Sequence, residues 1–187
     1  MLYSLNMRIA VIGPQNTGKS TFIKDFLKEF PHYKTPKETY RDVVKSKKLT
    51  INQKTNEESQ REIRDFMYKQ FCHSVDKNVI FDRSLIDNYV YTYAQYVEGK
   101  ISKTFLEESE DLMKEVLHSV DMYFFIPASL SVSLVNDELR DTDSKFIDEV
   151  NGYFLKTLFE LAREQRIIIK IISGTRKERI KKVKELL

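Results

Sequence analysis

Short apolar runs separated by longer amphipathic stretches form the main pattern of this sequence. Four runs rich in β-branched and aromatic residues predict buried strands, at residues 8–12, 79–81, 122–126 and 167–172. In the stretches between them, apolar residues recur at intervals of three and four, which is typical of amphipathic helices. Strands that alternate with helices in this way predict an α/β fold, a parallel sheet flanked by helices on both sides.

The helical stretches have recognisable starts. Thr55 and Glu58 have the spacing of a capping box, and Thr35, Pro36 and Glu38 have the spacing of a second one with proline at its preferred first position. Residues 33–37 also carry a weak signal for an extra strand. We expect helices over residues 19–30, from 55 to about 76, over 84–97, 104–120 and 130–139, from about 146 onward, and after Gly174.

Length and composition fit one globular domain over residues 1–187, because the sequence has no internal repeat and no Gly/Ser-rich linker. The 41% of hydrophobic residues can fill a core, and the single cysteine, Cys72, excludes a disulfide framework. No apolar run reaches the roughly 18 residues of a membrane span, and no secretory signal pattern is present. We therefore expect a cytoplasmic protein without a membrane partner.

The charges are balanced, with 31 Lys and Arg against 28 Asp and Glu. This balance disfavours a nucleic-acid partner without excluding one. The three histidines show no metal-ligand spacing, so a transition-metal site is not expected. Acidic residues interrupt the basic C-terminal segment, which predicts a solvated helix face made of Lys177, Arg179, Lys181, Lys182 and Lys184.

The first predicted strand is followed by a phosphate-binding loop (P-loop). The sequence GPQNTGKS satisfies GxxxxGK[ST] and lies between a strand and a helix, as the mechanism requires. Loop N–H groups can hold phosphates, Lys19 can bridge the terminal phosphates, and Ser20 can ligate Mg²⁺. No Asn-Lys-x-Asp motif for guanine follows, which favours ATP over GTP. The expected nucleotide-binding residues are Gly13, Asn16, Thr17, Gly18, Lys19, Ser20 and Thr21.

The second predicted strand ends in Asp82, Arg83 and Ser84. The carboxyl ends of parallel strands border the ligand crevice, so these residues should lie near the phosphates. Asp82 can position Mg²⁺ or accept the proton of an attacking hydroxyl, and Arg83 can bind phosphate. Ser84 and Asp87 also have capping-box spacing, and a capping role is compatible with catalysis.

These motifs carry a family resemblance. The P-loop and the segment FDRSLIDNYVY (81–91) resemble P-loop nucleoside and nucleotide kinases. Residues 36–41 are similar to the ribosylnicotinamide kinase domain of bifunctional NAD biosynthesis regulators, except that Lys37 is inserted between the proline and the glutamate. The resemblance implies a three-layer P-loop NTPase fold with a short helical lid at about residues 128–146, and the use of ATP and Mg²⁺.

The resemblance also implies roles for single residues. Glu38 matches the general base that acts on the acceptor hydroxyl, and Arg41 lies one helical turn further on. Arg140 matches a lid arginine that balances charge in the transition state, although relatives often carry two or more, and a charged turn explains the segment equally well. The loop 173–176 would pass over the adenine.

The helix after Asp82 carries tyrosines on one face, Tyr89 and Tyr93 among them. They could stack on a planar acceptor ring, or they could be half-buried core. Asp87 could bond to the sugar or base of the acceptor.

We therefore expect a kinase that transfers the γ-phosphoryl group of Mg-ATP to a nucleoside- or nucleotide-like small molecule. Two alternatives stay open, a polynucleotide 5′-hydroxyl kinase and an ATP-dependent switch module without an acceptor. The sequence also leaves the oligomeric state open, a homodimer included.

Overall fold

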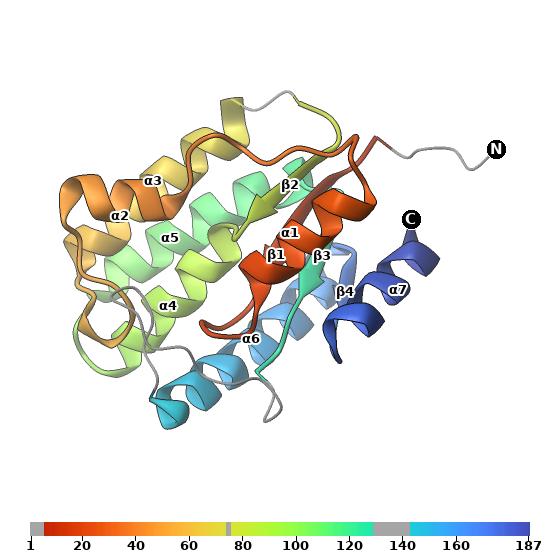
Figure 1. The fold of residues 1–187 in the computed structure, drawn as a ribbon. Helices are drawn as coiled ribbons and strands as arrows, with labels where there is room; N and C mark the ends of the chain where they lie inside the picture. The colour runs from red at the N-terminus through yellow and green to blue at the C-terminus, as the bar shows by residue number, and fades with distance from the viewer. Residues whose placement is uncertain (1–5, 74–75, 129–142) are drawn as a thin grey trace.

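The computed structural model describes residues 6–73, 76–128 and 143–187, which form three layers around one sheet (Figure 1). All strand pairs are parallel, and the strand order is β2-β1-β3-β4. The predicted parallel sheet is confirmed, with a last strand shorter than expected. The strands are β1 (Arg8–Ile12), β2 (Val79–Asp82), β3 (Met122–Phe125) and β4 (Ile169–Ile171).

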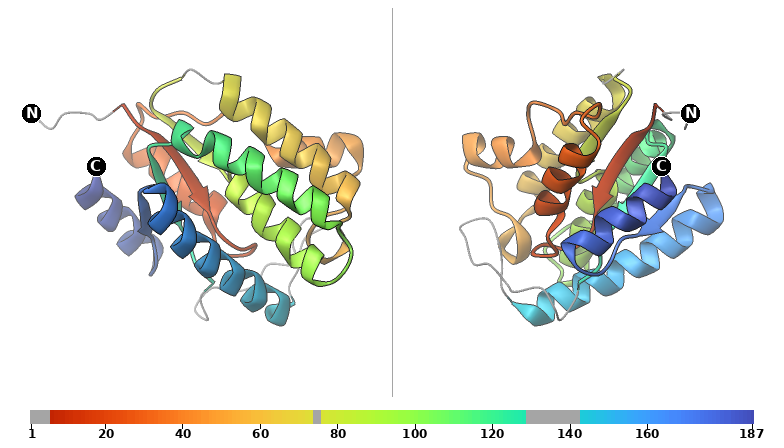
Figure 2. Two further views of the ribbon diagram at one scale, coloured as in Figure 1. Left: turned by 180° about the vertical axis from the view of Figure 1, so that it is seen from behind. Right: turned by 45° about the vertical axis from the view of Figure 1, so that its right-hand side comes forward.

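Helices cover both faces of the sheet, as Figure 2 shows. Side chains of β1 alternate between two cores, with Ile9 and Val11 in one and Ala10 and Ile12 in the other. The first core packs against α1 and α7, and the second against α2 to α6. The helices are α1 (Lys19–Glu29), α2 (Tyr40–Lys47), α3 (Glu57–His73), α4 (Leu85–Val97), α5 (Lys103–Val116), α6 (Ser144–Gln165) and α7 (Arg176–Leu186), with short 3₁₀ turns η1 (Asn52–Lys54) and η2 (Leu117–Ser119).

The start of α2 differs from the sequence prediction. Thr39 is the N-cap and forms a capping box with Asp42, so a helix start at Thr35 with Glu38 as its third residue is wrong. The chain before it is extended, since Lys34 pairs with Val79 in an isolated parallel bridge. This bridge lies within the residues that carry the weak strand signal.

The start of α3 is also displaced. The side chain of Asn56 accepts the N–H of Ser59 at 2.9 Å, and the hydroxyl of Thr55 instead accepts a bond from Gln60 at 3.1 Å. Asn56 therefore caps this helix in place of the predicted pair Thr55 and Glu58.

The predicted helix over residues 130–139, most of the predicted lid and Arg140 lie outside the described residues. Within the described residues, no helix is both long enough and apolar enough to cross a bilayer.

Candidate nucleotide and acceptor site

The P-loop joins the end of β1 to the start of α1 at the carboxyl edge of the sheet (Figure 1). Gly13 and Gly18 have φ angles of 139° and 84°, and Asn16 has φ 59°, so the loop turns at three residues with positive φ, two of them glycines. A Cβ at Gly13 would lie 2.3 Å from the carbonyl oxygen of Ile126, at the end of β3. The first glycine is thus required by the close approach of the neighbouring strand.

Lys19 is buried at the first position of α1. Its ammonium donates to the carbonyl of Gly13 at 2.7 Å and to that of Pro14, inside the curve of the loop. Burial, and to a smaller extent the nearby Arg83 cation, lower the pKa of Lys19 to about 7. A buried ammonium at the centre of this loop is placed to bind an anion, which would also restore its protonated state.

Ser20 and Asp82 meet beside the loop. The Ser20 hydroxyl donates to Oδ2 of Asp82 at 3.2 Å, whereas Oδ1 of Asp82 is buried and has no partner. Arg41 reaches the same hydroxyl with Nη2 at 3.5 Å. One hydroxyl and one carboxylate with a free oxygen fit Mg²⁺, which usually takes only one or two protein carboxylates together with phosphate oxygens. In the described parts of the chain, no group of three or more His, Cys, Asp or Glu gathers as a metal site.

Arg83 and Asp87 form a buried ion pair next to Lys19. Nη1 of Arg83 lies 3.1 Å from Oδ1 of Asp87, and the two side chains are 8% and 1% exposed. Arg83 has φ 80°, a strained conformation for a non-glycine residue, and such strain concentrates at functional sites. Its Nε is buried without a partner, so the guanidinium keeps a free donor.

Asp87 ties α4 to the P-loop. Its carboxylate accepts the N–H of Ser84 at 2.9 Å, which completes the predicted capping box of α4, and the N–H of Gly13 at 3.2 Å. Burial raises the pKa of Asp87, and the neighbouring Arg83 and Lys19 cations oppose that shift. Asp87 therefore fixes the start of α4, the Arg83 side chain and the first residue of the P-loop together.

A pocket adjoins this cluster between α2, α3 and α4. Its cavity volume is about 40 Å³, below the range of fully formed small-molecule sites, and it is partly open to solvent. The Arg83 guanidinium lies 4.9 Å from the ring centroid of Tyr40 and 5.3 Å from that of Tyr91. The lining residues are Tyr40, Ile51, Asn52, Gln60, Ile63, Met67, Arg83, Asp87, Asn88 and Tyr91.

Asn88 contributes an unpaired acceptor to the pocket. Its Nδ2 donates to both the main-chain carbonyl and Oε1 of Gln60, at 3.1 and 2.7 Å. The carbonyl of Gln60 can only accept, so it fixes which end of the Asn88 amide carries the NH₂ group. Oδ1 of Asn88 is consequently a buried acceptor without a partner.

The structure brings most of the predicted site residues together and leaves others apart. Lys19, Ser20, Arg41, Asp82, Arg83 and Asp87 form one cluster. Glu38 is exposed and does not line the pocket, and its main-chain carbonyl accepts a bond from Gln70 at 2.8 Å.

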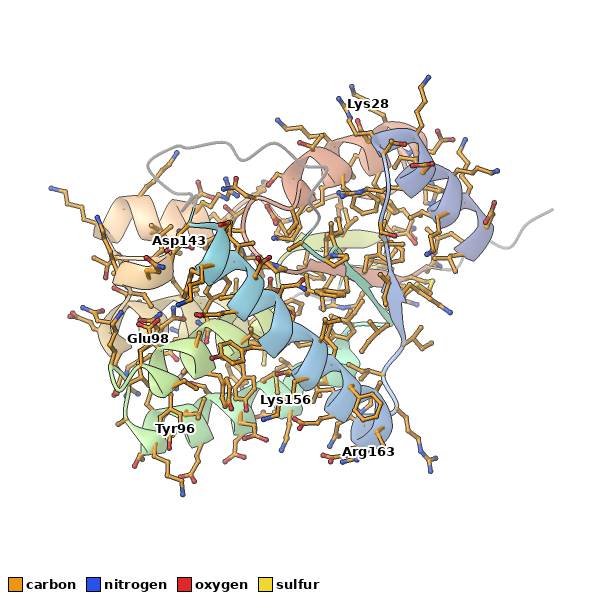
Figure 3. The ribbon with its side chains drawn as sticks, turned by 90° about the horizontal axis from the view of Figure 1, so that it is seen from below. Lys28, Tyr96, Glu98, Asp143, Lys156 and Arg163 are labelled. Carbon is orange, nitrogen blue, oxygen red and sulfur yellow. The ribbon has the colours of Figure 1, made fainter. Side chains whose placement is uncertain are left out.

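The two predicted substrate tyrosines face away from the pocket. The ring of Tyr93 packs 5.1 Å from that of Tyr153 of α6, and the ammonium of Lys156 lies over the same ring at 5.3 Å. Lys156 is labelled on α6 in Figure 3. Tyr89 lies beside Glu110 and Glu160, so it faces α5 and α6. Tyr91 lines the pocket, and its hydroxyl accepts the N–H of Gln15 in the P-loop at 2.9 Å.

Three site residues escaped the sequence analysis. Tyr91 and Asn88 lie three residues apart, and this spacing could have identified them as one face of α4. Arg179 was expected on a solvated helix face, which is wrong, because it is only 6% exposed. It lies four residues before the buried Val183, a signal that it shares the inner face of α7. The four lysines of that predicted face are exposed.

Comparison with solved structures identifies the fold. A NadR protein in complex with NR matches with a TM-score of 0.70 and 17% identity, over 95% of this chain and 50% of the other. A deoxyadenosine kinase from M. mycoides matches with a TM-score of 0.70 and 19% identity, over 96% of this chain and 97% of the other. Thymidylate kinase from Candida albicans matches with a TM-score of 0.65 and 17% identity, over 97% of this chain and 90% of the other. The chain has the P-loop nucleoside/nucleotide kinase fold.

The NadR match is partial, since this chain spans half the length of that protein. No curated protein matches the sequence significantly. A family model described as an AAA domain matches residues 8–179, and the chain therefore belongs to this AAA-domain family.

Proposed function

We propose that this protein is an ATP-dependent kinase that transfers the γ-phosphoryl group to a nucleoside- or nucleotide-like small molecule. The observation that carries the proposal is the junction at Arg83 and Asp87. These two residues contact the P-loop side through Gly13 and Lys19, and they also line the separate pocket. A phosphate cradle that opens beside a second pocket suits a reaction with two substrates better than simple nucleotide hydrolysis.

On the donor side, the P-loop N–H groups and Lys19 would bind the phosphates of ATP. Ser20 and Asp82 would hold Mg²⁺, which supplies charge neutralisation at the phosphate oxygens. Lys19, Arg41 and Arg83 supply three cations against the carboxylates of Asp82 and Asp87. This excess of positive charge favours phosphate groups and stabilises the charge of the transferring phosphoryl group.

On the acceptor side, a carboxylate must take the proton when the acceptor is a hydroxyl. Neither Asp82 nor Glu38 lines the pocket, but Asp82 fits this role better, because it precedes the pocket residue Arg83 and has a free oxygen, whereas Glu38 is exposed. Tyr40 and Tyr91 offer aromatic surface to a planar ring. Arg140 would complete the charge balance from the lid.

The unpaired Oδ1 of Asn88 points to one property of the acceptor. A buried acceptor atom without a partner costs about 1–3 kcal/mol, a cost that a ligand N–H or O–H would remove. The acceptor should therefore present a hydrogen-bond donor to Asn88, such as an amide or amino group on its ring.

ADP formation from Mg-ATP tests the proposal. We would measure it alone and with nucleosides, nicotinamide riboside, nucleoside monophosphates and 5′-hydroxyl oligonucleotides, with Lys19→Ala as the blank. We expect stimulation by one small-molecule class, abolished in the blank. Stimulation by oligonucleotides alone would make the protein a polynucleotide kinase, and slow hydrolysis that ignores every acceptor would favour a switch module.

The stimulating acceptor then allows a sharper test at Asn88. Asn88→Leu should raise the KM for that acceptor about tenfold or more while the KM for ATP stays the same. An analogue that lacks the donor group should bind wild type and variant equally well. Equal loss for both compounds would show that the variant only disturbs the packing of the pocket.

A further inference from the structure

Arg179 connects two loops that are distant in the sequence. Its Nη1 donates to the main-chain carbonyl of Thr17 in the P-loop, and its Nε donates to that of Gly174 after β4, both at 2.9 Å. The same Nη1 lies 3.3 Å from the position of a Cβ at Gly18. The guanidinium is thus packed directly on the P-loop, on the side of the sheet that α1 and α7 cover (Figure 1).

The bond to Thr17 orients the P-loop backbone. The carbonyl of Thr17 and the N–H of Gly18 belong to one planar trans peptide unit, so they point in opposite directions. By holding the carbonyl on the side of α7, Arg179 turns the N–H of Gly18 away from α7. A cation on the carbonyl also polarises the peptide and makes its N–H a stronger donor.

The charge of Arg179 has no counter-ion in the described parts of the chain. The neighbouring contacts between α1 and α7 are exposed ion pairs, Arg176 with Asp25 and Lys184 with Glu29, whereas Arg179 donates only to neutral carbonyls. Burial lowers the pKa of its guanidinium. A buried cation of this kind is costly unless negative charge comes close, and the phosphates of a nucleotide in the P-loop would supply it.

We propose that Arg179 is a positioning residue that couples the loop after β4 to the P-loop. Through it, nucleotide binding at either loop strengthens nucleotide binding at the other loop. This inference rests on the ATP-binding part of the proposed function, with the adenine against the loop after β4 as the family resemblance implies, and it is independent of the acceptor. It goes beyond the P-loop motif, because Arg179 lies 159 residues or more from every residue of that motif.

The test compares Arg179→Met and Arg179→Lys with Lys182→Met, which removes the same charge from the exposed face of α7. Calorimetry would measure the affinities for Mg-ATP, for inorganic tripolyphosphate and for adenosine, each below the melting temperature of the variant. We expect Arg179→Met to weaken Mg-ATP binding about tenfold, equivalent to about 1.4 kcal/mol. Lys182→Met should stay within about twofold, and Arg179→Lys should be intermediate, since an ammonium lacks the planar fork.

The effect of tripolyphosphate on the affinity for adenosine is a second readout, which a purely structural role of Arg179 would not change. In wild type, saturating tripolyphosphate should tighten adenosine binding, and in Arg179→Met the two should bind independently. A folded Arg179→Met or Arg179→Lys with unchanged Mg-ATP affinity and a lower melting temperature would overturn the inference. If Arg179→Met does not fold, the Mg-ATP affinity of folded Arg179→Lys decides between the inference and a purely structural role.

The two proposals fail in different ways. A wild-type protein that binds Mg-ATP and phosphorylates no acceptor would remove the kinase proposal and leave the role of Arg179 to be decided by the affinities. A wild-type protein that binds no Mg-ATP would overturn both.

Discussion

Gly13 is the residue on which the position of the P-loop depends most directly. It has φ 139°, and a Cβ there would collide at 2.3 Å with the main-chain oxygen of Ile126. We predict that Gly13→Ala lowers the free energy of unfolding by about 3 kcal/mol or more, because the strained φ and the backbone clash add together. Urea denaturation followed by circular dichroism measures this change.

Gly152 provides the matched control. It lies within α6, and among the described residues no atom outside its own helix lies within 4 Å of its Cβ position. Gly152→Ala should therefore raise the free energy of unfolding by about 0.5–1 kcal/mol, since alanine is the better helix former. If Gly13→Ala and Gly152→Ala changed the free energy of unfolding equally, the close approach of Ile126 would not be the reason for glycine at position 13.

Lys19 predicts a dependence of stability on pH. Its pKa is about 7 in the folded protein against 10.5 for the free side chain, so between these values the unfolded chain binds the extra proton. Stability must then rise with pH across this window and be lowest below pH 7, where both states are protonated. The free energy of unfolding of wild type relative to Lys19→Met should increase from pH 6.5 to pH 9.5, as measured by urea titration. A constant difference would show that the ammonium is not desolvated.

At the scale of elements, α2 carries Tyr40 and Arg41 to the site, and its start is set by Thr39. The Asp42 carboxylate accepts both the N–H and the hydroxyl of Thr39 at 2.8 Å. We predict that Thr39→Ala costs about 1 kcal/mol of stability, the typical value for a lost cap. Thr35→Ala, at the start that the sequence pattern favoured, should stay within about 0.5 kcal/mol. A larger loss of stability for Thr35→Ala than for Thr39→Ala would contradict Thr39 as the N-cap of α2.

Elements with strong periodicity were predictable from the sequence. The strands, α1, α4 and α7 occur where the apolar spacing places them, because burial on one face is a local property of the pattern. The P-loop and the Asp82–Arg83 strand end also lie where predicted, since parallel strands bring their carboxyl ends to one edge.

Features decided by distant contacts were not predictable. The segment before α2 pairs with the sheet edge through Lys34 and Val79, a contact that local spacing does not reveal. The burial of Arg179 depends on carbonyls in two loops, and the orientation of Asn88 depends on Gln60 of another helix. Local spacing indicates which face of a helix Arg179 and Asn88 share, but it does not identify these distant partners.

At the scale of the whole molecule, nucleotide binding should stabilise the fold, because the site joins β1, β2, α1 and α4. A ligand at about 100 times its Kd adds about 2.7 kcal/mol. For a chain of this size we predict that Mg-ATP raises the melting temperature by about 5–10 °C, measured by scanning calorimetry. Lys19→Met should show little of this shift. An equal shift in both proteins would place the nucleotide outside the P-loop.

The order of the strands also has a consequence for the synthesis of the chain. β1 is made first, yet it lies between β2 and β3, and in the described part of the chain its first partner is Val79, about 70 residues later. At about 5–20 residues per second, the ribosome needs roughly 4–14 seconds to deliver that first partner. During this interval β1, in which Ile9 to Ile12 are buried in the folded protein, has no parallel partner, so its apolar side chains stay exposed or pack only against the helices made before β2.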